Sequence, residues 1–337
     1  MCTAIALQSL QGETFFGRTL DFSYDIAPHM YIVPQNYQWN NELNNRTTTN
    51  AYRFIGIGQQ LEGITAFFDG VNEHGFAAAA LYFYGYALYS PPASNSQAEQ
   101  IVSYDFLTYI LGNCESVEDL ALQLGRIQIV GLEDPLTQSV APLHWIAADS
   151  TGACIVVELT SSGQRIYDNP LGVLANSPTF PWQVTNLRSY MNASPMQTEE
   201  VTWGDIPLSQ FGQGGGTVGL PGGFTSPERF VRASYLKTHI PTPETATEAI
   251  ASCFHIMDSV TVPKGAVITS RDTYDYTKYT AFMDVNTREY FFNTYDNLQI
   301  RRASMDEYST ENGTLLDLGS LNQPMMIENM SMSSETE

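Results

Sequence analysis

The order of strand-like and helix-like patterns most restricts the fold of this chain. Strand patterns fill the first hundred residues, and helical periodicity follows around 103–124. Strands then return, a second helical pair occupies about 226–257, and the chain ends in strands. Blocks of this kind argue for a layered body and against a repeating βαβ sheet. No internal repeat or clean linker is evident, so we expect one domain over residues 1–337.

We expect the first two strands to form a hairpin. Thr3–Gln8 and Thr14–Phe22 are rich in β-branched and aromatic residues, and Gly12 lies in the turn between them. A tight hairpin would place Cys2 opposite residues 18–20, within a cross-strand distance of about 5 Å.

The other predicted elements extend along the whole chain. Helices are expected at Ser103–Leu111, Val117–Leu124, Ser226–Lys237 and Glu244–Met257. Further strands are expected at Met30–Val33, Arg53–Ile57, Thr65–Phe68, Phe76–Phe83, Leu143–Ala147, Cys154–Leu159, Gly172–Ala175, Ala266–Thr269, Thr277–Asp284 and Tyr290–Asn293. The polar, irregular segment near 185–207 predicts an excursion from the body, and 331–337 predicts a frayed tail.

The composition supports a sizeable core and excludes several kinds of partner. Apolar residues make up 43% of the 337 residues, and 19 Tyr and 17 Phe are among them. Thirty-six acidic residues against 15 basic ones give a net charge of −21. Because this charge repels phosphate backbones and anionic lipids, we expect neither nucleic acid nor membrane partners.

The chain start and the cysteines suggest where the protein works. The first residues lack the basic and long apolar regions of a signal peptide, and no apolar run reaches about 18 residues. We therefore expect a cytoplasmic protein. The four cysteines show no CxxC spacing and the five histidines show no metal-ligand spacing. Neither a disulfide framework nor a metal site is expected.

Cys2 is the most informative position for chemistry. An aminopeptidase normally removes Met1 before a small residue, and Cys2 would then carry both a thiol and a free α-amine. The α-amine has an ordinary pKa of about 7.7–8.0, so a near-neutral base would be tethered to a good nucleophile. The alternative is that a Met-Cys start has no chemical role.

Arg18 and Asp21 place two charges on a strand of apolar and aromatic residues. Such charges are costly to bury unless they are paired. One interpretation is a structural ion pair. The other is functional: Asp21 would hold the α-ammonium of Cys2, and Arg18 would stabilise its thiolate.

Asn176 and Arg229 are two further candidates. Asn176 ends a predicted strand, where its amide could donate to a developing oxyanion or could serve only as a turn residue. Arg229 lies in the first turn of a predicted helix, where a cation opposes the helix dipole. This position indicates that Arg229 either has a partner on another segment of the chain or forms a surface salt bridge.

Several alternatives lack their sequence signals. The run Gly214–Gly216 is not followed by the Lys-Ser/Thr of a phosphate loop, and no GxSxG elbow of an α/β-hydrolase occurs. The stripe Tyr82, Tyr84, Tyr86 and Tyr89 predicts either core packing or the wall of a pocket for a ring.

A set of motifs in this order resembles the choloylglycine hydrolase family, which contains penicillin V acylases and conjugated bile-salt hydrolases. The resemblance runs from residue 2 to about residue 300. The motifs are Met1–Thr3, Gly17–Phe22, Asp69–Gly75, Leu174–Pro178, Leu220–Phe224 and Arg229–Arg232.

This resemblance implies a fold and an activity. The fold is an α+β, four-layer αββα sandwich of the N-terminal nucleophile hydrolases, with two antiparallel sheets between helical layers. The activity is hydrolysis of a small-molecule linear amide without a metal or cofactor. The excursion near 185–207 resembles the segment that joins family members into homotetramers.

The resemblance also implies roles for individual residues. Cys2 would be the nucleophile and its own amine the general base. Arg18 and Asp21 match the residues that orient and activate the cysteine, and Arg229 matches the arginine that completes the charged network. Asn176 matches the side-chain oxyanion donor. The second oxyanion donor would be the backbone N–H of residue 82.

Residue 82 also bears on the substrate. Bile-salt hydrolases usually have Asn at this position, whereas Tyr82 is similar to the penicillin V acylases, and a phenol would suit a phenoxyacetyl group. His74 and Ile26 depart from the family pattern in the pocket region. We expect penicillin V or a related N-acyl amide, with bile salts as the alternative within the same chemistry. An inactive relative that acts as a binding protein is the alternative of another class.

Overall fold

A computed structural model describes residues 1–41, 43, 46–94, 96, 98–309, 313–327 and 329. The tail at 331–337, expected to fray, lies outside these residues.

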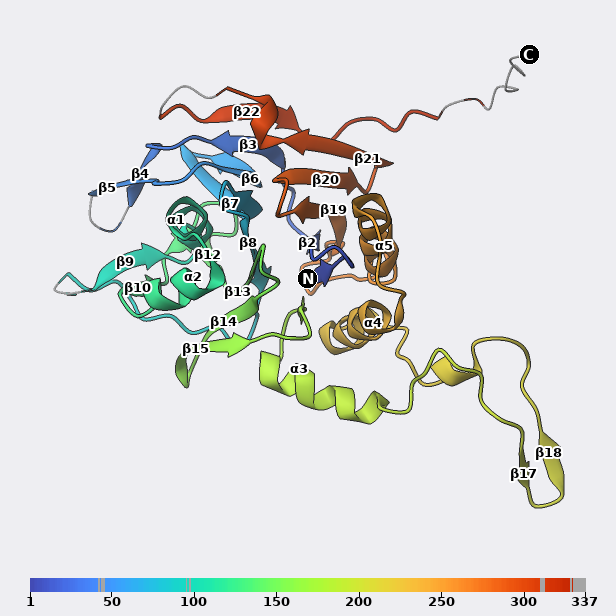
Figure 1. The fold of residues 1–337 in the computed structure, drawn as a ribbon. Coiled ribbons are helices and arrows are strands. Elements are labelled where there is room, and N and C mark those ends of the chain that lie inside the picture. Colours follow the sequence, from blue (N-terminus) through green and yellow to red (C-terminus); the bar gives the residue numbers. More distant parts are fainter. Residues whose placement is uncertain are drawn as a thin grey trace, which may run out of the picture.

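Two antiparallel sheets form the body of the protein (Figure 1). The six-stranded sheet has the order β16-β1-β2-β19-β20-β21, which joins the N-terminal hairpin to strands from the end of the chain. Its strands are β16 (Val173–Leu174), β1 (Cys2–Gln8), β2 (Thr14–Phe22), β19 (Tyr276–Asp284), β20 (Glu289–Thr294) and β21 (Asn297–Ser304).

The eight-stranded sheet faces it with the order β15-β14-β13-β8-β7-β6-β3-β22. Its strands are β15 (Gly163–Asp168), β14 (Cys154–Thr160), β13 (Leu143–Asp149), β8 (Phe76–Tyr82), β7 (Ile64–Asn72), β6 (Phe54–Leu61), β3 (His29–Val33) and β22 (Leu316–Ser320). Four two-stranded pairs lie at the periphery: β4 (Gln38–Asn41) with β5 (Arg46–Thr49), β9 (Glu99–Val102) with β10 (Ile127–Val130), β11 (Glu133–Asp134) with β12 (Ser139–Val140), and β17 (Val201–Trp203) with β18 (Ile206–Leu208).

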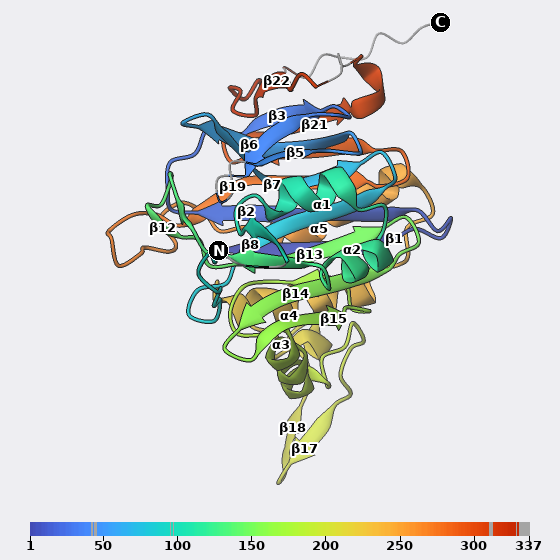
Figure 2. The same cartoon turned by 90° about the vertical axis from the view of Figure 1, so that its left-hand side faces the viewer.

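Helices cover the outer face of each sheet. Helices α4 (Ser226–His239) and α5 (Ala246–Asp258) pack on the six-stranded sheet, while α1 (Phe106–Asn113) and α2 (Val117–Gln123) pack on the eight-stranded sheet (Figures 1 and 2). Helix α3 (Phe180–Asn186) follows β16. The body is therefore the expected four-layer αββα sandwich.

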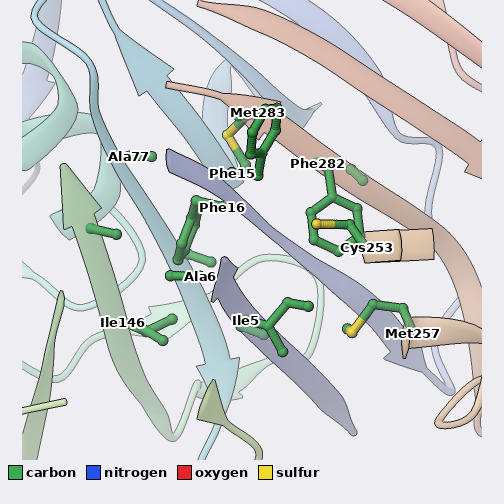
Figure 3. Close-up of a cluster of buried hydrophobic side chains, with 14 of the residues drawn as sticks. Ile5, Ala6, Phe15, Phe16, Ala77, Ile146, Cys253, Met257, Phe282 and Met283 are labelled. Atoms are coloured by element: carbon green, nitrogen blue, oxygen red, sulfur yellow. The ribbon is translucent and has the colours of Figure 1, made fainter. Parts of the chain in front are cut away.

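The core fills the space between the sheets and under the helices. In Figure 3, Ala6 and Phe16 lie toward Ala77 of the eight-stranded sheet, whereas Ile5 lies on the side of Cys253 from α5. A second cluster lies between the eight-stranded sheet and helices α1 and α2. This alternation along β1 and β2 follows from the period of two in strands, and it decides which charged side chains can meet.

The predicted hairpin and helices are confirmed, with shifted limits. Cys2 pairs with Leu20 in the β1–β2 register. Helix α1 begins at Phe106 rather than at 103, because β9 pairs with β10 up to Val102 and residues 103–105 form the turn between the strand and the helix.

One expectation about local structure is wrong, and another underestimated the order of a segment. The expected strand Ala266–Thr269 forms only a single bridge, between Ile268 and Tyr274. The segment near 185–207 is more ordered than expected: it contains the end of α3, a 3₁₀ turn at Leu187–Tyr190, and the projecting β17–β18 hairpin (Figure 2). Two other 3₁₀ turns are Gly215–Thr217 and Met305–Glu307. Among the described helices, none has the length and apolar character needed to cross a bilayer.

Gly17 is predicted to be indispensable in β2. A Cβ at this position would overlap the carbonyl oxygen of Ala281 and the ring of Phe282 in β19. Gly17→Ala should therefore separate β2 from β19 and lower the melting temperature sharply, as measured by thermal denaturation. Gly222→Ala is the control, since nothing lies within 4 Å of its added Cβ. Equal melting temperatures for the two variants would contradict this packing.

Candidate active site

The structure places Cys2 at the start of β1, at the interface of the two sheets. Its side chain is 4% exposed and lines an apolar pocket. Because side chains alternate along a strand, Cys2 lies on the same face of the hairpin as Ala4. Arg18 is the cross-strand partner of Ala4 and lies on that face too. The thiol and the guanidinium therefore both face the eight-stranded sheet.

Arg18 is completely buried between the sheets. Its Nε donates to the Thr19 carbonyl at 2.9 Å, and its Nη1 donates to the carbonyl oxygens of Ala80 at 3.0 Å and Phe68 at 3.2 Å. Burial lowers the pKa of Arg18, but the surrounding negative groups, with Cys2 first among them, outweigh this effect and raise it above its usual value. The guanidinium is therefore charged. Its Nη2 donates to no described residue and stays available for a thiolate or a substrate.

Asp69 on β7 is the carboxylate partner of Arg18, at 3.6 Å from Nη1. It accepts hydrogen bonds from the hydroxyls of Tyr279, at 2.6 Å, and Tyr290. Burial raises the pKa of Asp69, whereas Arg18 and the two hydroxyls counter that rise. Reasoning from the sequence did not select Asp69 as a site residue. The available signal was an acid inside the apolar run of β7.

Asp21 lies three residues beyond Arg18 and therefore on the opposite face of β2. Arg18 and Asp21 do not pair with each other, which excludes the simple ion pair considered from the sequence. Asp21 instead accepts a hydrogen bond from Thr277 at 2.6 Å and lies 3.7 Å from Nη1 of Arg229. Each of the two buried charges thus has its own partner.

Arg229 in the first turn of α4 is also completely buried. Nη1 donates to the Cys2 carbonyl and to the Thr3 hydroxyl, both at 2.5 Å, and Nη2 donates to Oδ1 of Asn176 at 2.6 Å. Burial lowers the pKa of Arg229, and Asp21 opposes that effect most strongly. A surface salt bridge is therefore the wrong interpretation of this residue, because its partners lie on β1 and after β16.

Asn176 follows β16, which pairs with β1 and so brings the amide beside Cys2. Its Oδ1 accepts the backbone N–H of Cys2 at 2.7 Å, and its Nδ2 donates to the Tyr82 carbonyl at 2.7 Å. Because an amide nitrogen carries two hydrogens, one remains for another acceptor. The structure therefore brings together Cys2, residue 82 and Asn176, the three positions that the family resemblance links.

Met1 shows what surrounds the amine of this terminus. Its ammonium donates to the Asp21 carbonyl at 2.6 Å and lies 3.3 Å from a carboxylate oxygen of Asp275. While Met1 is attached, the nitrogen of Cys2 is an amide and is not a base. Removal of Met1 would convert that nitrogen into an amine beside Asn176 and Asp21.

Two pockets meet at Phe22 and Tyr82. The apolar pocket reaches Cys2, and Leu20, Phe67 and Leu136 are among its other lining residues; it contains about 950 Å³ of empty space, open solvent included. The polar pocket is lined by Asn176, Arg271 and Asp275 among others. A molecule that spans both would carry an apolar part and a polar part, with its connecting bond near Cys2. Within the described part of the chain, no group of three His, Cys, Asp or Glu side chains could hold a metal ion.

Comparisons with known proteins show which family and which relatives this chain is similar to. The family model described as linear amide C–N hydrolases, choloylglycine hydrolase family, matches residues 2–317. A bile salt hydrolase/transferase of Clostridium perfringens is 35% identical over 91% of this chain and 93% of its own length.

Two solved structures are similar over nearly the whole chain. The mutant C2A conjugated bile acid hydrolase from Clostridium perfringens superimposes with a TM-score of 0.90 at 33% identity, covering 98% of this chain and 100% of the other. A penicillin V acylase from Agrobacterium tumefaciens gives a TM-score of 0.75 at 25% identity, covering 96% of this chain and 95% of the other.

Glu228, in the first turn of α4, should make the stability of the protein depend on pH. This carboxylate accepts hydrogen bonds from Thr225 and Gly223, and its pKa is lowered by the Thr225 hydroxyl first of all. Because the pKa of Glu228 is lower in the folded protein, its carboxylate stabilises the fold at pH values above the unfolded pKa of about 4.3. This stabilisation is lost as the pH falls through the folded-state pKa.

Gln keeps an acceptor for the capping hydrogen bonds but loses the charge, so we expect Glu228→Gln to cost about 0.3–1 kcal/mol of unfolding free energy at pH 7, and less at pH 3. Urea denaturation at the two pH values measures the difference. Glu307→Gln, at an exposed carboxylate beside Arg302, is the control. The same loss at both pH values would contradict the capping role.

Proposed function

The chain belongs to the choloylglycine hydrolase family of linear amide C–N hydrolases, and we propose that Cys2, exposed by removal of Met1, is its nucleophile. The observation that carries this proposal is the convergence of three buried groups on one thiol-bearing residue: Arg18 across the hairpin, Asn176 from β16 and Arg229 from α4. A structural cysteine does not require two buried guanidinium groups around it.

The roles follow from the chemistry of amide cleavage. The α-amine of Cys2 takes the thiol proton, and the charge of Arg18 stabilises the thiolate. The thiolate attacks the amide carbonyl, and the oxyanion accepts hydrogen bonds from Nδ2 of Asn176 and the N–H of residue 82. The ammonium of Cys2 then protonates the departing nitrogen. Water hydrolyses the thioester to release the acid and restore the thiol.

We propose conjugated bile salts as the substrate class, with penicillin V as the second candidate. The sequence favoured penicillin V because of Tyr82, but the bile-acid relatives are the more similar ones, at 33–35% identity against 25% for the acylase structure. The apolar lining of the pocket at Cys2 supports an apolar acyl group. Penicillin V is the second candidate because Tyr82 is half-buried and lines the pocket, where its ring could contact a phenoxyacetyl group.

Arg271 supports an acidic leaving group. It lines the polar pocket, its guanidinium lies 3.8 Å over the ring of Tyr24, and it donates to Ser23 at 2.7 Å. Glycine, taurine and 6-aminopenicillanic acid all carry an acid near the amide nitrogen. An arginine held in this way could pair with that acid.

Replacing Arg271 should identify the leaving-group pocket. Arg271→Met should lower kcat/KM for glycocholate about 10- to 100-fold, because a charge-assisted hydrogen bond is lost. The neutral ethanolamide of cholic acid should be cleaved equally by the native enzyme and the variant. Arg301→Met, at an exposed arginine on β21, is the control. Parallel assays with penicillin V rank the two substrate classes, and a strong preference for penicillin V would reverse the proposed order.

Replacing Cys2 tests the nucleophile. Cys2→Ala should abolish hydrolysis with a circular dichroism spectrum and melting temperature close to native, because the thiol makes no hydrogen bond in the described structure. Cys2→Ser should leave at most weak activity, since a hydroxyl is a poorer nucleophile. Undiminished rates in either variant would exclude the thiol mechanism. A native protein without activity on any acyl amide would favour an inactive relative that acts as a binding protein.

We also propose that the segment near 185–207 joins copies of the chain into a homotetramer. Its support is exposed apolar surface: Met191 is 78% exposed, and Trp203 on β17 is 74% exposed. Trp203→Ser together with Met191→Ser should shift the mass measured by light scattering from tetramer toward monomer. Leu298→Ser, at an exposed leucine on β21, is the control. A native monomer would contradict the proposal. The expected cytoplasmic location stays a prediction.

A further inference from the structure

We infer that His144, paired with Glu158, is a positioning residue for both proposed oxyanion donors. This inference rests on the proposed roles of Asn176 and residue 82. Neither His144 nor Glu158 belongs to the site predicted from the sequence, and both are completely buried. They lie on the neighbouring strands β13 and β14, and His144 Nδ1 is 3.3 Å from Oε1 of Glu158.

The first contact of His144 holds the peptide unit that carries Asn176. Nε2 of the imidazole lies 2.9 Å from the Ala175 carbonyl oxygen, while the N–H of the same peptide unit, on Asn176, donates to the Ser226 hydroxyl at 2.8 Å. One peptide plane is therefore held at both ends. Fixing this plane fixes the direction in which the Asn176 side chain leaves the backbone, and hence where Nδ2 points.

The second contact of His144 holds the segment of residue 82. The imidazole stacks on the ring of Phe83, with the ring centroids 4.3 Å apart and the planes 6° apart. Phe83 follows residue 82 directly, and its own N–H donates to the Pro142 carbonyl at 2.6 Å. A single imidazole thus touches the chain next to each donor, at Phe83 and at Ala175, which are 92 positions apart in the sequence.

The protonation of the ring follows from its partners. A carbonyl oxygen can only accept, so Nε2 must carry a proton toward Ala175. Nδ1 of the ring lies within hydrogen-bond distance of Oε1 of Glu158. Oε1 of Glu158 also accepts the N–H of Phe180 at 2.8 Å, at the start of α3. Glu158 therefore sets the orientation of the ring and connects it to the helix that follows Asn176.

Two amide substitutions separate positioning from simple packing. The terminal nitrogen of Gln can occupy the place of Nε2 in His, whereas that of Asn lies near the place of Nδ1. His144→Gln keeps a donor for Ala175, and His144→Asn loses it. We expect His144→Asn to lower kcat about 10- to 100-fold, less than the full loss of an oxyanion donor, with KM within about threefold. His144→Gln should keep a kcat about five times higher or more.

Two further readouts distinguish this role from a general loss of structure. Alkylation of Cys2 by iodoacetamide forms no oxyanion, so its rate should not change in either variant. An aldehyde analogue of the acyl group forms a thiohemiacetal at the oxyanion site, so its inhibition constant should rise in parallel with the fall in kcat. Trp145→Phe is the matched control, because Trp145 is the next residue on β13 and faces α1. It should lower stability and leave kcat unchanged.

The outcomes separate this inference from the proposed function. If Asn176→Ala leaves kcat unchanged, the oxyanion assignment fails. If Asn176→Ala lowers kcat but His144→Asn does not, the positioning role alone fails. Equal kcat for the Asn and Gln variants, or a parallel loss of alkylation, would also overturn it. Should the His144 variants not fold, Glu158→Gln at nearly constant volume must lower kcat several-fold with unchanged alkylation.

Discussion

A guanidinium group that is buried away from water needs hydrogen-bond acceptors close to it. The site is organised around two such groups. Arg18 and Arg229 are both completely buried. Carbonyl oxygens take most of their donors, and each guanidinium has one carboxylate within 4 Å, Asp69 for Arg18 and Asp21 for Arg229. Since removing one partner of such a pair costs about 3–5 kcal/mol, the segments that supply the acceptors cannot move independently. Among the described residues, Nη2 of Arg18 has no hydrogen-bond acceptor.

Because side chains alternate along a strand, the two faces of the hairpin carry different residues of the site. Arg18 and Cys2 face the eight-stranded sheet, and Asp21 and Thr3 face α4. One hairpin therefore presents Cys2 to the apolar pocket between the sheets and presents its backbone and Asp21 to Arg229. Residues that lie more than two hundred positions apart meet because β19 pairs with β2 and α4 packs on β1.

The sequence supported the local features better than the long-range ones. The hairpin and the two helices of the second helical pair follow from periodicity and turn residues, and the motifs brought out Cys2, Arg18, Asp21, Asn176 and Arg229 together. The partners of those residues could not be predicted in the same way. Asp69 meets Arg18 only because two sheets face each other, and no local pattern encodes that contact.

The prediction of the substrate class from the sequence was limited in the same way. Tyr82, together with Phe224 and Ser226–Arg229, favoured penicillin V, but a few side chains in a pocket with many lining residues are weak support, and the more similar relatives act on bile acids by name. His144 and Glu158 escaped notice because a lone histidine on an apolar strand most often serves packing. Only its contacts with Ala175 and Phe83 in the folded protein connect His144 to the site.

Trapping the covalent intermediate tests the central claim most directly. Native protein is mixed with glycocholate or penicillin V, quenched in acid during turnover, digested, and analysed by tandem mass spectrometry. We predict an N-terminal peptide that begins at Cys2, lacks Met1, and carries the acyl group as a thioester on that cysteine. An active protein that retains Met1, or an acyl group on any other residue, would contradict the account.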